Sequence, residues 1–255
     1  MIKKDSFSVK DAVQLCLFLL GCRTLAELLL YLFRIDLILV YDIAFLVVVI
    51  FIIKKSGKKE LDSILQWREV PAALFFALVV MYFGMEILRR EIGNIFAIIL
   101  LMPDGFFDHS YHRGVFMTLL SNAVFPAVTE ELFFRGVILK RLQKNYSRRK
   151  ALLVSSLLFG LLHLNPWQAL LAFISGLFLG WIYLQWKIIW LCMFIHCYNN
   201  ILASFLSFPV NYLPNTRSFS VLVLHPLWLD ILGILLFLTG LAAVLASGKR
   251  KNPTT

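Results

Sequence analysis

Long apolar runs separated by short polar stretches are the dominant pattern of this 255-residue chain. A bilayer core takes about 20 residues of helix. That length divides the chain into eight predicted membrane spans, near 11–33, 36–53, 71–88, 114–139, 151–165, 167–186, 188–206 and 227–247. The apolar stretch 95–102 is too short to cross before Pro103, so we expect an interfacial helix or part of a loop there. The pattern predicts an all-α, polytopic membrane helix bundle that forms a single integral membrane domain over 1–255.

Composition agrees with a membrane protein. Hydrophobic residues make up 60% of the chain, its mean hydropathy is +0.81, and phenylalanine alone occupies 23 positions. The first apolar stretch contains Arg23 and Glu27 and a second span follows it directly, so we expect a retained first membrane helix rather than a cleaved signal peptide. The four cysteines lie in apolar stretches without the close pairing of zinc or redox motifs, which indicates packing residues.

The basic residues predict an orientation. With both termini in the cytoplasm, 18 of the 25 lysines and arginines fall on the inside and five on the outside, as the positive-inside rule requires. The net charge of +10 then reflects attraction to anionic cytoplasmic headgroups rather than a nucleic-acid partner. The outer loop 104–112 contains aspartates and histidines, and we interpret it as a solvated loop rather than a metal site.

Six polar residues interrupt the otherwise apolar predicted spans of the second half of the chain. They are Glu130, Glu131 and Arg135 in FPAVTEELFFRGVI, His163 in SSLLFGLLHLN, and His196 and Asn200 in LCMFIHCYNNIL. Ionisable groups are costly within a bilayer and usually mark a function there. Counted from the nearest cytoplasmic lysine, Glu130, His163 and His196 lie at depths of about 15, 20 and 14 Å, at about 1.5 Å per residue. We therefore expect them to converge on one site buried in the bundle.

Spacing within the first of these helices separates the two glutamates. Glu131 and Arg135 are four residues apart, in the favoured order for an ion pair on one helix face. Glu130 is rotated by about 100° and so lacks that partner. We interpret Glu131 and Arg135 as a structural pair and Glu130 as the working carboxylate, suited to act as a general base.

Spacing in the later helix predicts a pair of hydrogen-bond donors. His196 and Asn200 are also four residues apart, so an imidazole and a carboxamide project from one face, an arrangement that suits a developing oxyanion. Asn199 could take the place of Asn200 if the helix is rotated.

Together these motifs carry a resemblance. Glu130-Glu131-x-x-x-Arg135, Phe159-x-x-x-His163 and His196-x-x-x-Asn200, in this order, resemble the CPBP superfamily, which contains the type II CAAX prenyl endopeptidases and the bacteriocin-processing or Abi proteins. The resemblance covers about residues 114–206, the expected catalytic core. It implies an intramembrane endopeptidase in which Glu130 and His163 activate a water while His196 and Asn200 hold the oxyanion.

Metal use is open at this level. Glu130, His163 and His196 match the two-histidine, one-carboxylate set of zinc hydrolases. However, the sequence lacks a His-Glu-x-x-His helix, and using Glu130 as a ligand would leave no obvious base. We therefore favour a metal-independent glutamate mechanism without a cofactor, with zinc as the alternative.

Three classes of function fit a chain of this kind. We expect an endopeptidase of a prokaryotic plasma membrane that hydrolyses a membrane-associated or lipidated peptide or protein. The alternative is a non-catalytic membrane scaffold or immunity protein of the same family. A transporter is disfavoured, because its polar residues would line a path through the whole membrane instead of clustering at one depth.

Overall fold

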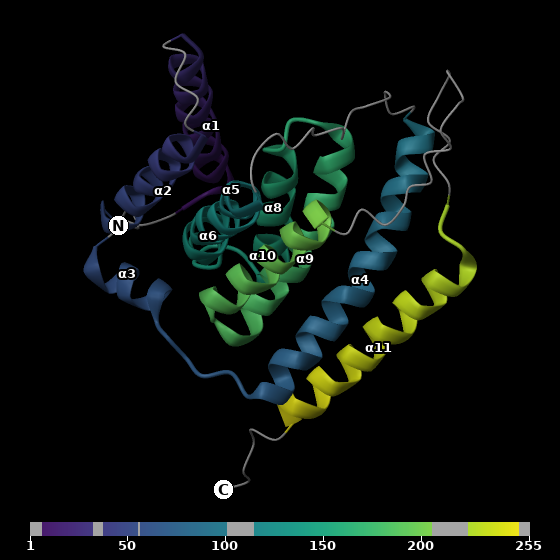
Figure 1. The fold of residues 1–255 in the computed structure, drawn as a ribbon. Helices are drawn as coiled ribbons and strands as arrows, with labels where there is room; N and C mark the ends of the chain where they lie inside the picture. Colours follow the sequence, from purple (N-terminus) through teal and green to yellow (C-terminus); the bar gives the residue numbers. More distant parts are fainter. Residues whose placement is uncertain (1–6, 33–37, 56, 101–114, 206–223, 250–255) are drawn as a thin grey trace, which may run out of the picture. The chain divides into compact units, whose positions relative to one another are not determined.

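The computed structural model describes residues 7–32, 38–55, 57–100, 115–205 and 224–249, and within these ranges the chain is helical with no strand (Figure 1). The outer loop 104–112 lies outside them. The chain divides into two compact units, one made of 1–67 and 110–206 and the other of 68–109 and 207–255. The prediction of one membrane domain stays a prediction.

The first unit contains most of the helices, and π-helical turns (η) interrupt the segment 115–142. Its elements are α1 (Val9–Leu32), α2 (Ile38–Lys55), α3 (Lys58–Leu65), α5 (Val115–Leu119), η1 (Leu120–Val124), α6 (Phe125–Glu131), η2 (Leu132–Leu139), α7 (Lys140–Leu142), α8 (Arg148–Leu161), α9 (Pro166–Trp186) and α10 (Ile189–Phe205). Helix α10 packs against α6 and η1, and α8 packs against α9. These contacts bring the three sequence motifs into one unit.

The turn between α8 and α9 corrects one sequence prediction. The predicted span 151–165 places His163 inside a helix, whereas α8 ends at Leu161 and His163 lies in the turn that follows. Asn165 caps α9 by accepting a hydrogen bond from the Gln168 amide at 2.7 Å, and Pro166 occupies the first turn of that helix. The asparagine cap and proline therefore start the next helix close to the predicted position 167, whereas the preceding helix ends four residues earlier than predicted.

The second unit pairs α4 (Ala72–Ile99) with α11 (Leu227–Lys249), which lie side by side in Figure 1. The predicted span 71–88 is too short, because α4 continues through 99 and takes in most of the stretch expected to be an interfacial helix or loop. Two of its arginines are paired within the helix: Glu86 accepts from Arg89 Nε at 2.7 Å and from Arg90 Nε at 2.8 Å. Local pairing thus lets the helix pass a charged segment that hydropathy treats as a boundary.

Glycines allow this pair of helices to pack closely. A Cβ atom added to Gly84 would meet the backbone of α11 at 2.4 Å, and one added to Gly240 would meet Met81 at 2.5 Å. Glycine therefore permits the two backbones to approach, as it does between membrane helices.

Three helical segments are long and apolar enough to cross a bilayer, among the residues that the structure describes: Ala72–Ile99, Pro166–Trp186 and Leu227–Ser247. They fit an integral membrane protein. The count of eight spans is an expectation that these three segments do not test.

Candidate active site

The two glutamates follow each other at the end of α6 and differ in their burial and in their ion pairs. Arg135, in η2, donates from Nη1 to Glu131 Oε1 at 2.8 Å, so the ion pair expected from the four-residue spacing is present. Both side chains are fully buried. The Glu130 side chain is 22% exposed, and its carboxylate lies near a histidine.

That histidine is His196 of α10, which lies between the two glutamates. Its Nδ1 is 2.8 Å from Glu131 Oε1, and its Nε2 is 3.7 Å from Glu130 Oε2. The first distance is a hydrogen bond, whereas the second exceeds hydrogen-bond length. One imidazole therefore contacts a buried carboxylate on one side and a partly exposed carboxylate on the other.

The ion pair determines which nitrogen of His196 is bonded to hydrogen. Because Glu131 is paired with Arg135, its carboxylate is an acceptor, so Nδ1 must be the donor of the 2.8 Å bond. The other nitrogen, Nε2, is then the one that faces Glu130. A histidine whose Nδ1 is held by a carboxylate presents Nε2 to its surroundings in a fixed direction.

The Phe159 ring links the two histidines. It forms edge-to-face contacts with His163 and His196, at centroid distances of 5.2 and 5.8 Å, and the Arg135 guanidinium lies 4.9 Å from its centre. His163 Nδ1 lies 2.9 Å from the carbonyl oxygen of Phe159 and donates to it. This bond leaves Nε2 as the nitrogen that His163 can offer to a reactant. Within the described part of the chain, no hydrogen bond joins His163 to Glu130.

The two asparagines of α10 differ in their arrangement. Asn199 Nδ2 donates to Asn200 Oδ1 at 3.0 Å, which occupies the oxygen of Asn200 and orients its amide. The side-chain amino group of Asn200 can therefore donate a hydrogen bond to a substrate. Asn200 lies one helical turn beyond His196, on the same face.

The bond between Glu131 and His196 is the feature that sequence reasoning missed. The two residues are 65 positions apart, and the spacing within each helix does not indicate how α6 and α10 are rotated toward each other. Glu131 is thus more than the partner of Arg135. Its second oxygen, Oε2, is buried without a hydrogen-bond partner. Arg135 is held further by donating from Nη2 to the Gly176 carbonyl of α9 at 3.1 Å.

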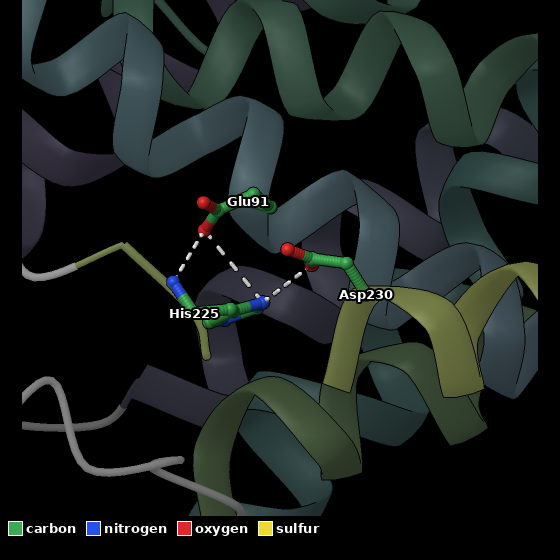
Figure 2. Close-up of side chains that lie close together, drawn as sticks. All are labelled: Glu91, His225 and Asp230. Carbon is green, nitrogen blue, oxygen red and sulfur yellow. Dashed lines mark hydrogen bonds and ion pairs between the residues drawn. The ribbon is translucent and has the colours of Figure 1, made fainter. Parts of the chain in front are cut away.

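A second group of ionisable side chains lies in the other unit (Figure 2). His225 Nδ1 is 3.3 Å from Asp230 Oδ1 and 3.6 Å from Glu91 Oε2, and its backbone amide donates to that same Glu91 oxygen at 3.0 Å. Asn94 Nδ2 also donates to it, at 3.1 Å. These bonds tie the residues just before α11 to α4. The possible metal-ligand atoms of Glu91, His225 and Asp230 all lie within 4.8 Å of one another. Among the described residues, those of Glu130, His163 and His196, the ligand set of the zinc alternative, do not form such a group.

Comparisons with known proteins agree with the motifs. Residues 112–202 match the family model described as type II CAAX prenyl endopeptidase Rce1-like. No curated protein and no solved structure matches the chain. The matched segment contains all three motifs of the candidate site, and the match supports the resemblance to the CPBP superfamily, the group of the CAAX-type intramembrane proteases.

Proposed function

We propose that this chain is an intramembrane endopeptidase that uses Glu130 to activate water. The observation that carries the proposal is the position of His196, whose two ring nitrogens face Glu131 and Glu130 at 2.8 and 3.7 Å. The family match supports a CAAX-type protease at the level of the family. The residue roles below are part of the proposal.

We assign His196 the role of an oxyanion donor through Nε2, because Nδ1–H is already used in the bond to Glu131. Donation from Nε2 requires the doubly protonated ring, in which Nε2–H can donate to the carbonyl oxygen of a bound substrate.

The proposed reaction proceeds in two steps. Glu130 accepts a proton from a water that His163 helps to orient, and the resulting hydroxide attacks the scissile carbonyl carbon. His196 Nε2–H and the amino group of Asn200 donate to the oxyanion of the tetrahedral intermediate. The intermediate then collapses: the C–N bond breaks, and protonated Glu130 returns the proton to the leaving amine. The products are a carboxylic acid, which then ionises, and an amine, and the glutamate is regenerated.

We further propose that both termini face the cytoplasm and that the substrate is a membrane-associated or lipidated peptide. The orientation rests on the distribution of basic residues. Arg89 and Arg90 are two of the five basic residues counted on the outside, and because α4 extends to Ile99 they lie within that helix. Labelling of single cysteines introduced at Lys58 or Ser147 tests the orientation, and modification from the outside would contradict it.

Cleavage of defined peptides tests the activity. Purified full-length protein in liposomes is incubated with a farnesylated C-terminal peptide and with an unlipidated membrane peptide, and the products are identified by mass spectrometry. We expect cleavage of at least one of them, and loss of cleavage in Glu130→Gln. The matched control is Glu69→Gln, the same change at an exposed glutamate outside the site, which should retain activity. Cleavage that survives Glu130→Gln would refute the glutamate mechanism.

Exhaustive chelation separates the two variants of this mechanism. The cluster described above needs no metal ion to polarise the carbonyl, so we expect turnover to continue after chelation. Loss of turnover that zinc restores would favour the alternative in which Glu130, His163 and His196 are ligands.

A further inference from the structure

An apolar groove lies between α1 and α2, outside the candidate active site. It has a volume of about 560 Å³ and is half-open. Its apolar lining is Leu15, Phe18, Val47, Val48, Phe51 and Ile52. The volume is within the range of about 300–1,000 Å³ typical of ligand sites. Phe18 and Phe51 are 56% and 65% exposed, so this surface is apolar where it is also accessible.

Two cations complete the lining of the groove. Lys55, in the last turn of α2, is exposed, and Arg141 comes from α7. The remaining lining is apolar, so the groove combines a hydrocarbon surface with positive charge. This combination matches an amphiphile with an apolar chain and an anionic headgroup, and not a wholly polar ligand or a neutral hydrocarbon.

Arg141 belongs to a cluster of cations beside the groove. Arg141 Nε and Lys144 Nζ share one carboxylate, that of Glu60, at 3.1 and 3.7 Å. Burial lowers the pKa of Lys140, and the nearby Lys144 and Arg141 lower it further, while Glu60 opposes them. The cations therefore repel one another, and a further anion bound beside them would be stabilising.

We propose that this groove binds an anionic phospholipid, with an acyl chain along the apolar lining and the phosphate held by Lys55 and Arg141. A basic pocket between membrane helices is the kind of site that holds acidic lipid headgroups. The guanidinium suits this role because its planar fork of five donors pairs with phosphate oxygens. The inference is independent of the proposed proteolytic activity.

Lipid retention tests the headgroup contact. Full-length protein is reconstituted in liposomes with equal amounts of phosphatidylglycerol and phosphatidylethanolamine and extracted, and the bound lipids are counted by native mass spectrometry. We expect wild-type protein to retain phosphatidylglycerol preferentially and Lys55→Gln to retain about fivefold less, the effect of roughly one basic residue. Lys54→Gln removes the same charge from an adjacent, exposed lysine that does not line the groove, and should retain as much as wild type.

A second pair of variants tests the acyl-chain contact. Val47→Trp places a large side chain in the groove, whereas Ile43→Trp makes a similar change at another exposed position of α2. We expect only the first to reduce retention. Glycerol phosphate, the headgroup without its chains, should not displace the lipid. Equal losses in the two lysine variants, or no preference in wild-type protein, would overturn the proposal.

Discussion

Replacing Glu131 by glutamine should destabilise the protein far more than the same change at its neighbour. Glu131 is fully buried, and one of its oxygens accepts hydrogen bonds from Arg135 and His196, both at 2.8 Å. The variant leaves the guanidinium of Arg135 as a buried charge without a carboxylate, which costs roughly 3–5 kcal/mol in comparable pairs. A loss of that size corresponds to a melting temperature lower by on the order of 10 °C.

Glu130→Gln is the matched comparison, because the two residues are adjacent and the chemical change is identical. The Glu130 side chain is 22% exposed and its contact with His196 is 3.7 Å long, so we expect a loss below about 1 kcal/mol. Thermal unfolding in detergent and folded yield measure stability, and peptide cleavage measures turnover. Glu130→Gln should be folded but inactive. Equal stability of the two variants would refute our assignment of the glutamates.

Three further predictions concern single positions. Asn200→Ala should lower turnover by about 10² to 10³ with little change in substrate binding, as the loss of one oxyanion donor does; steady-state kinetics that show a change in KM alone would contradict this role. Gly84→Ala should lower the melting temperature because its Cβ would meet the α11 backbone, whereas Gly21→Ala, with nothing within 4 Å, should not. Ser8→Ala should lower the free energy of unfolding by about 0.5–2 kcal/mol, because it removes the hydroxyl that accepts a hydrogen bond from the Asp11 amide and caps α1. Ser8→Thr should retain most of that stability in the same unfolding assay.

Much of the candidate site follows from spacing along single helices. The pair of Glu131 and Arg135 is local, so its four-residue separation predicts the contact that the structure contains. The contact between Glu131 and His196 joins two helices and depends on their rotation about their axes. Neither hydropathy nor spacing encodes that rotation. It results from packing between α6 and α10, which a single sequence does not reveal.

The helix ends show the same division between local and distant causes. Hydropathy places the end of the third predicted span at 88 because charged residues follow, yet α4 continues since Glu86 pairs with Arg89 and Arg90 within the helix. The position of His163 in a turn depends on the cap at Asn165, a local signal that the apolar run obscures. Here the structure could have been predicted more closely from capping residues than from hydropathy.

The buried cluster around Glu131 has a consequence for protein engineering. Its unpartnered Oε2 and its desolvated charges lower the stability that the fold could reach, since apolar replacements of buried ion pairs are often neutral or stabilising. A variant that combines Glu131→Met, Arg135→Met and His196→Phe should therefore be inactive but more stable to unfolding. It should be better suited to crystallisation than the natural sequence. Evolution that selects for activity keeps such a chain below its attainable stability.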